Sequence, residues 1–93
     1  MGRFIDQLLA RFDLPPESAG SAARITLSGG REVCIERHRG LLAYTQTEVS
    51  VSCGALRCRI RGTGLLLRAM TSELLLVGGE IDGVDLERSD GRL

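Results

Sequence analysis

His38 is the only histidine in the 93-residue sequence and the first candidate for a catalytic base. It lies in the charged stretch E-R-H-R-G at residues 36–40, which we expect to be a turn between strands. No serine or aspartate stands at a catalytic spacing, so an enzyme would have to pair His38 with Glu36 or Cys34. We therefore predict a structural histidine and no catalytic residues.

Arginine is the other distinctive residue, because it accounts for all 12 basic residues. Arg57, Arg59 and Arg61 alternate along one predicted strand and so share a face. Nucleic-acid binding through this face is the alternative function, but stacking aromatics are scarce in the β region, and the zero net charge leads us to expect no nucleic-acid partner. Because binding residues often lie on loops, the charged turn is also a candidate interaction site. The candidate residues of both segments are Arg37, His38, Arg39, Arg57, Arg59 and Arg61.

Charge is distributed unevenly along the chain. Residues 31–68 contain seven Arg and three Glu, whereas residues 73–90 contain six acidic residues and one Arg. The simplest interpretation is that the two segments are neighbours in the fold and neutralise each other. The alternative is a polar molecule whose copies stack head to tail.

The three cysteines are Cys34, Cys53 and Cys58, and they do not form the cluster with histidine that a metal site needs. An odd number of cysteines without a secretory leader indicates reduced thiols in the cytoplasm. No apolar run approaches the ~18 residues of a membrane span, so we do not expect the chain to cross a bilayer by itself. We predict no metal, no cofactor and no small-molecule substrate.

Residues 3–13 are predicted to form an amphipathic helix that ends before Pro15 and Pro16. A helix this short is marginal in water, so it needs a surface to lie on. That surface is either the sheet of its own chain or a partner, and peripheral association with a membrane is a weaker form of the second alternative. The apolar stripe consists of Phe4, Ile5, Leu8, Leu9 and Phe12, of which Phe4, Leu8 and Phe12 are candidate interaction residues.

From residue 24 onward, apolar and polar residues alternate with the period of β-strands. The clearest hairpin turns at Gly54-Ala55, where Gly54 would supply the positive φ of a type II′ turn. The predicted cross-strand pairs are Cys53–Leu56, Val51–Cys58 and Val49–Ile60 on the apolar face, and Ser52–Arg57, Ser50–Arg59 and Glu48–Arg61 on the polar face.

Residues 65–67 and 74–77 are apolar without alternation, so both faces of these strands should be covered by the helix, a second sheet or another subunit. With turns placed at residues 62–64 and 78–79, the sequence predicts seven or eight short antiparallel strands. The expected fold is mainly β, a small antiparallel β-sandwich preceded by one helix, with a small barrel or a β-solenoid as alternatives. The expected divisions are a helix at 1–16, a linker at 17–23, a β domain at 24–88 and a tail at 89–93.

Several short motifs in order resemble the YabP/YqfC family of sporulation proteins, and its YqfC branch more closely. The motifs are R-I-T-L-S-G at residues 24–29, V-C-I-E-R-H-R-G-L-L-A-Y-T at 33–45 and E-V-S-V at 48–51. The similarity extends to L-P-P-E at 14–17 and E-L-L-L-V-G-G-E-I-D-G-V at 73–84, and it spans roughly residues 8–87. Arg37 stands where Asn is usual in the family, and Ala23 stands where Pro often precedes Arg-Ile-Thr.

The resemblance implies a β-sandwich protein of endospore-forming Firmicutes that is expressed in the mother cell and has no enzymatic activity. It also implies a gene neighbour that encodes a membrane protein. We therefore expect a non-enzymatic interaction or assembly module in the mother-cell cytoplasm, acting peripherally at the forespore membrane. Its expected partners are a membrane protein, further copies of the same chain, or both.

Overall fold

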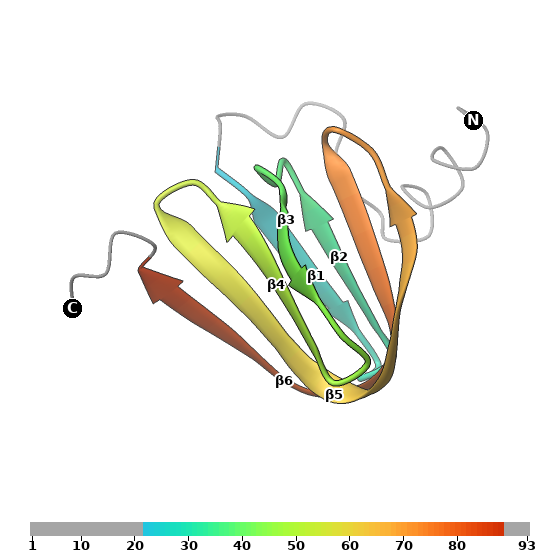
Figure 1. The fold of residues 1–93 in the computed structure, drawn as a ribbon. Coiled ribbons are helices and arrows are strands. Elements are labelled where there is room, and N and C mark those ends of the chain that lie inside the picture. Colours follow the sequence, from blue (N-terminus) through green and yellow to red (C-terminus); the bar gives the residue numbers. More distant parts are fainter. Residues whose placement is uncertain (1–21, 89–93) are drawn as a thin grey trace.

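The computed structural model describes residues 22–88, which form one antiparallel sheet of six strands in the order β1-β2-β6-β5-β4-β3 (Figure 1). The strands are β1 (Arg24–Ser28), β2 (Glu32–Glu36), β3 (Leu41–Tyr44), β4 (Glu48–Cys53), β5 (Leu56–Met70) and β6 (Leu74–Arg88). This part of the chain is therefore mainly β, and it contains no helix that could span a membrane. The predicted helix at 1–16, most of the linker and the tail lie outside the described residues.

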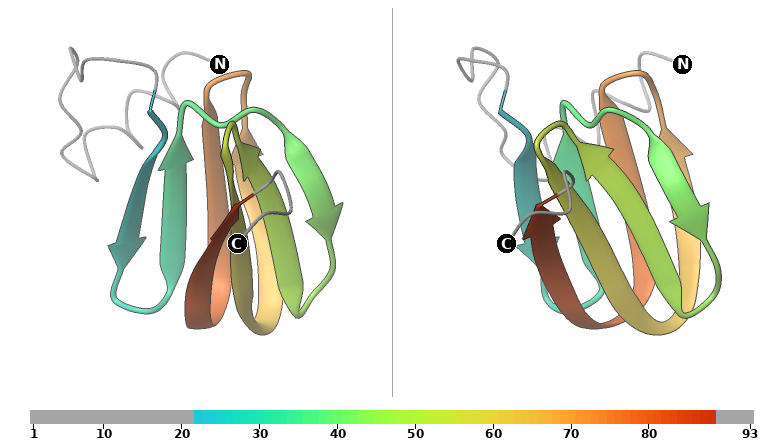
Figure 2. Two further views of the ribbon diagram at one scale, coloured as in Figure 1. Left: turned by 90° about the vertical axis from the view of Figure 1, so that its left-hand side faces the viewer. Right: turned by 60° about the vertical axis from the view of Figure 1, so that its left-hand side comes forward.

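The sheet is folded across itself at the middle of its two longest strands. β5 and β6 run side by side, bend at the same end of the molecule and return, so that two half-sheets face each other (Figures 1 and 2). One half consists of β1, β2, residues 74–78 of β6 and residues 66–70 of β5, and the other contains the remaining parts of β5 and β6 with β4 and β3. The core lies between the halves and consists of Val33, Ile35, Val49, Val51, Cys58, Ile60, Leu65, Leu75 and Val77.

The prediction of seven or eight short strands in a two-sheet sandwich was wrong, because two predicted turns are bends within continuous strands. Residues 62–64 lie inside β5 and residues 78–79 lie inside β6. The pairing of β5 with β6 shifts register between Arg61 and Gly62 and again between Thr63 and Leu66, as expected of β-bulges. The bulges bend the strands without ending them, so one sheet supplies both layers.

Glycine is required at this bend because the two strands approach each other too closely for a side chain. A Cβ on Gly62 would collide with the backbone carbonyl oxygen of Glu80. A Cβ on Gly79 would lie 2.7 Å from the carbonyl oxygen of Gly64, and the φ of Gly79 is +133°, which L-residues rarely adopt. Gly62 and Gly79 thus permit the sheet to fold.

The predicted hairpin is confirmed residue by residue. β4 and β5 pair in the predicted register, including Val51 opposite Cys58 and Ser50 opposite Arg59. Gly54 has a φ of +80°, as the turn requires. A one-residue slip would have placed every apolar residue on the outer face, so the alternation alone was sufficient to determine the register.

The expectation for the leucine-rich segments is confirmed in one case and wrong in the other. Residues 74–77 are all buried, with exposed fractions of 4% or less. In the segment 65–67, Leu65 is buried but Leu66 is 57% exposed. Residues 66–70 form a sheet edge whose outer face is open, and this accounts for the difference.

Candidate interaction surface

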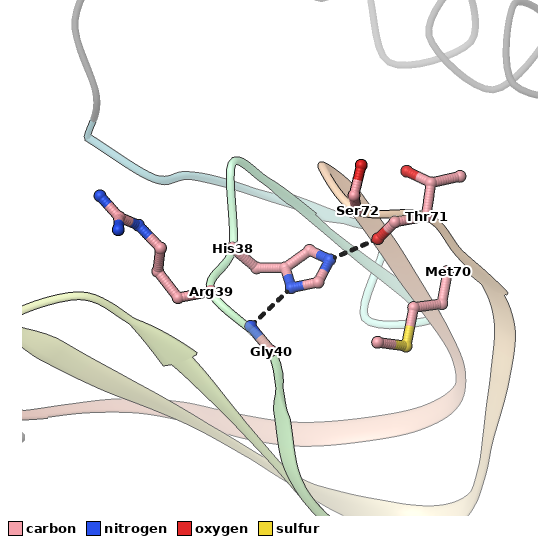
Figure 3. A pocket seen from close by; sticks show the side chains of 6 residues that line it. All are labelled: His38, Arg39, Gly40, Met70, Thr71 and Ser72. Atoms are coloured by element: carbon pink, nitrogen blue, oxygen red, sulfur yellow. Dashed lines mark hydrogen bonds between the residues drawn. The ribbon is translucent and has the colours of Figure 1, made fainter.

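His38 lies in the β2–β3 loop and connects this loop to the turn between β5 and β6. The residue is 6% exposed. Its Nδ1 accepts a hydrogen bond from the Gly40 N–H at 2.9 Å, and its Nε2 lies 2.8 Å from the carbonyl oxygen of Thr71. Since Nδ1 accepts, the proton is assigned to Nε2, which donates to Thr71. Figure 3 shows the ring held between the two loops. Both ring nitrogens are engaged by backbone groups, as a structural histidine requires.

The hollow beside His38 is open to solvent, and the described residues that line it offer no catalytic partner for the imidazole. It is lined by His38, Arg39, Gly40, Met70, Thr71 and Ser72, and the side chain of Arg39 points away from the imidazole (Figure 3). The His38 ring nitrogens bond to Gly40 and Thr71 rather than to Glu36 or Cys34. Within residues 22–88, no three His, Cys, Asp or Glu side chains gather as a metal site would require.

Arg37 is the one non-glycine residue among residues 22–88 with a positive φ, at 61°. Asn tolerates this left-handed conformation better than other side chains do. The Asn that the resemblance implies at this position would adopt this conformation readily. In this chain, Arg37 instead donates from Nε to the carbonyl oxygen of Ala22 at 2.9 Å and lies 3.8 Å from Glu36.

Arg57, Arg59 and Arg61 lie beside the acidic end of β6. Arg57 and Arg59 each donate from Nη2 to the carboxylate of Glu87, at 2.6 Å and 2.8 Å. Arg61 donates from Nε to Asp85 at 2.7 Å. These bonds lower the pKa of the Glu87 carboxyl, chiefly through Arg57, and that of the Asp85 carboxyl, chiefly through Arg61. The basic and acidic segments are thus neighbours that neutralise each other, as the simpler interpretation of the sequence predicted.

The cysteines differ sharply in their surroundings, and none of them is in a disulfide. Cys58 lies in the core, where burial, followed by the nearby Cys53 and Asp85, raises its thiol pKa to about 12. Burial also raises the pKa of the partly exposed Cys53. Cys34 is buried on the opposite face of the sheet. A thiol with a raised pKa is a poor nucleophile, so neither Cys53 nor Cys58 is suited to catalysis.

Two of the free edges of the folded sheet, β3 and residues 66–70 of β5, lie next to each other (Figure 2). The N–H of Leu67 donates to the hydroxyl oxygen of Tyr44 at 3.0 Å, and the N–H of Leu65 donates to the carbonyl oxygen of Gln46 at 2.8 Å. Large apolar side chains remain exposed along both edges, and we call this group the apolar edge. Its members are Leu42, Tyr44, Leu66 and Met70, with exposed fractions of 55%, 43%, 57% and 47%.

The predicted interaction residues do not form one surface. Arg37, His38 and Arg39 lie in the β2–β3 loop, whereas Arg57, Arg59 and Arg61 lie on β5. Phe4, Leu8 and Phe12 lie outside the described residues. The apolar edge was not predicted, because Leu66 was expected to be covered and Leu42 and Tyr44 were assigned only to a strand. The presence of the sole tyrosine on a short strand was the only available signal.

The described residues define a small β domain built from one folded antiparallel sheet. The model of the YabP family matches residues 20–92, and the chain belongs to this family. The uncharacterized protein YqfC of Bacillus subtilis (strain 168) is 34% identical over 77 residues, which cover 83% of each chain. No solved structure matches. The resemblance noted in the sequence is confirmed, and family membership implies a sporulation-related protein.

Proposed function

We propose that this chain is a non-enzymatic interaction module of sporulation, which acts in the mother cell at the forespore membrane by binding a membrane-protein partner. Membership of the YabP family supports the sporulation setting. The observation that carries the proposal is the apolar edge, where four large apolar side chains are between 43% and 57% exposed. Large apolar side chains that stay exposed along an unpaired sheet edge are typical of sites of protein contact.

The apolar edge fits a partner that supplies an extended apolar segment. A strand at a sheet edge presents backbone N–H and C=O groups that can pair with another chain, and its side chains then select the partner. β3 and residues 66–70 of β5 offer two such edges side by side. A juxtamembrane or cytoplasmic segment of a membrane protein could pair with either of them.

The test follows a fluorescent fusion of the full chain in sporulating Bacillus subtilis cells that lack YqfC. We expect the wild type to gather at the forespore membrane and the double variant Leu42→Glu/Leu66→Glu to spread through the mother cell. Leu86→Glu is the matched control, because Leu86 is 55% exposed but lies on β6, away from the apolar edge. Identical localisation of the edge variant and the wild type would contradict the proposal.

Self-association through the same edge is distinguished by light scattering of the purified protein. If the edge joins two copies, the wild type will be larger than a monomer and the double variant will be monomeric. A monomeric wild type that still gathers at the forespore membrane would indicate a different partner molecule.

Nucleic-acid binding through the arginine face is the weaker alternative. Each of the three guanidinium groups already donates to Glu87 or Asp85, so a phosphate would have to displace a carboxylate. We expect no binding of duplex DNA or single-stranded RNA at low salt, where such binding is strongest. Tight binding that Arg59→Ser weakens would favour this alternative.

A further inference from the structure

The half-sheet that contains β2 and the first part of β6 is buried on both faces. Successive residues of a strand point to opposite faces, so Cys34, Leu74 and Leu76 point away from the core that Ile35 and Leu75 enter. Cys34, Leu74 and Leu76 are nevertheless only 1%, 4% and 1% exposed. We call these three residues the outer patch. An outer face of a single folded sheet would ordinarily be open to water, so something covers this patch.

The described strands account for little of this cover. The strands that adjoin β2 extensively are β1 and β6, which lie beside it in the same sheet rather than over it. Arg68 extends across the same face, because a Cβ on Gly78 would lie 2.6 Å from its Cδ, and its guanidinium lies 3.7 Å from Glu32. Arg68 and Glu32 thus form one border of the outer patch, and its centre requires an apolar occupant.

We propose that residues 3–13 of the same chain lie on the outer patch. Their predicted apolar stripe of Phe4, Ile5, Leu8, Leu9 and Phe12 supplies the side chains that the patch needs. An eleven-residue helix is about 16 Å long, which is enough to cross the ~10 Å from β1 over β2 to residues 74–78 of β6. Residues 14–21 can reach about 26 Å when extended, which is enough to join the helix to β1.

The point where the chain leaves the sheet favours the same occupant. Arg37 holds the carbonyl oxygen of Ala22 at 2.9 Å, so the N-terminal segment departs beside Glu36, which pairs with Leu74 of the outer patch. A segment tethered so close has a high effective concentration at the patch and competes well against a second copy. This assigns the apolar stripe to its own sheet rather than to a membrane, and it does not depend on the apolar edge.

The three cysteines of the chain are built-in probes for the test. Cys34 belongs to the outer patch, Cys58 lies in the core and Cys53 is partly exposed. The full chain is treated with N-ethylmaleimide, and the modification rate of each cysteine is read by mass spectrometry of its peptides. In the wild type, we expect Cys53 to react fastest and both Cys34 and Cys58 to be protected.

The decisive variant is Leu8→Asp, which places a charge in the apolar stripe, and Gln7→Asp, on the polar side of the predicted helix, is its control. We expect Leu8→Asp to speed the modification of Cys34 by about tenfold or more through local opening, while Cys58 stays protected. Gln7→Asp should behave as the wild type. The proposal is wrong if Cys34 stays protected in Leu8→Asp. It is also wrong if Cys34 of the wild type is modified as fast as Cys53 of the wild type.

Two further measurements keep the outcome decisive. If Leu8→Asp also exposes Cys58, the whole domain has unfolded, and the milder Phe12→Ala is then read by the same criteria. Light scattering is recorded for each sample, because protection of Cys34 that disappears on dilution, together with a larger particle, would identify a second copy as the cover. That result would overturn the proposal while leaving the proposed membrane partner unaffected.

Discussion

The hydroxyl oxygen of Tyr44 accepts a hydrogen bond from the backbone N–H of Leu67 at 3.0 Å, across the seam between the two half-sheets. Tyr44 lies opposite Val49 on the inner side of β3, and Leu67 lies on the edge of β5. An edge N–H needs a partner when water is partly excluded, and a side chain from the other half supplies it. β3 and the edge of β5 are thus held together at this point by a side-chain hydrogen bond rather than by a strand ladder.

Tyr44→Phe removes only this hydrogen bond. We expect the free energy of unfolding to fall by about 0.5–1 kcal/mol, because Tyr44 is partly exposed and water can replace its hydroxyl. Hydrogen exchange gives the sharper measurement, since the amide of Leu67 should exchange faster while that of Val77, in the adjoining strand, should not. Unchanged protection of Leu67 would show that the bond does not hold the seam.

His38→Ala should be among the costlier substitutions in the loops. It leaves the Thr71 carbonyl and the Gly40 N–H without their partner in a site where the histidine is 6% exposed. We expect a loss of about 2–4 kcal/mol in the free energy of unfolding, measured with urea. Arg39→Ala, at an exposed neighbouring position, should change stability by no more than about 0.5 kcal/mol. Equal effects of the two substitutions would contradict a structural role for His38.

Gly62→Ala tests the bend that folds the sheet. The new methyl group would collide with the Glu80 backbone, which cannot move without breaking the pairing of β5 with β6. We expect a loss of about 3 kcal/mol or more, or failure to fold. Gly54→Ala is the comparison: it has open space but a φ of +80°, so it should cost only about 1 kcal/mol. Far-UV circular dichroism and urea unfolding would rank the two, and a well-tolerated Gly62→Ala would count against the bend.

Arg37→Asn should stabilise the chain. Arg37 has a φ of 61°, and Asn adopts this conformation at lower cost, so we expect a gain of about 0.5–1 kcal/mol in the free energy of unfolding. The lost hydrogen bond to the Ala22 carbonyl is exposed and should offset little of this gain. Arg37→Val should destabilise, since β-branched residues tolerate a positive φ poorly. If Arg39→Asn also raises the free energy of unfolding and Arg39→Val also lowers it, the effects at residue 37 do not arise from its backbone conformation.

The paired carboxyls predict how stability depends on acid. The folded-state pKa values of Asp85 and Glu87 are lowered, so these groups contribute stability above their unfolded pKa values, near 4, and lose it as pH falls through their folded values. The double variant Asp85→Asn/Glu87→Gln should therefore lose less stability than the wild type below about pH 4.

Salt provides the control for the acid experiment. Both carboxyls lie at the surface, so the difference between the wild type and the double variant should shrink in about 1 M NaCl. Acid unfolding curves of the same shape for both proteins, at low salt, would show that the arginine face contributes nothing measurable to stability.

The sequence was sufficient to predict a structural feature where its local pattern fitted only one arrangement of the chain. The alternation in residues 48–61 determined the hairpin register, because any slip would have exposed Val49, Val51 and Ile60. The opposite charges of residues 31–68 and 73–90 predicted that these segments are neighbours, and Arg57, Arg59 and Arg61 pair with Glu87 and Asp85 accordingly. The ordered motifs of the chain were likewise enough to indicate its family.

Only the tertiary structure decided between alternatives where a local pattern was compatible with more than one structure. Glycine permits both a turn and a bend, so only the close approach of Gly62 to Glu80 shows that β5 and β6 are continuous strands. A leucine run does not state which of its faces is covered, and Leu66 is open because its strand ends the sheet there. The positions of His38 and Tyr44 depend on contacts between residues 33 and 23 positions apart, which no local pattern encodes.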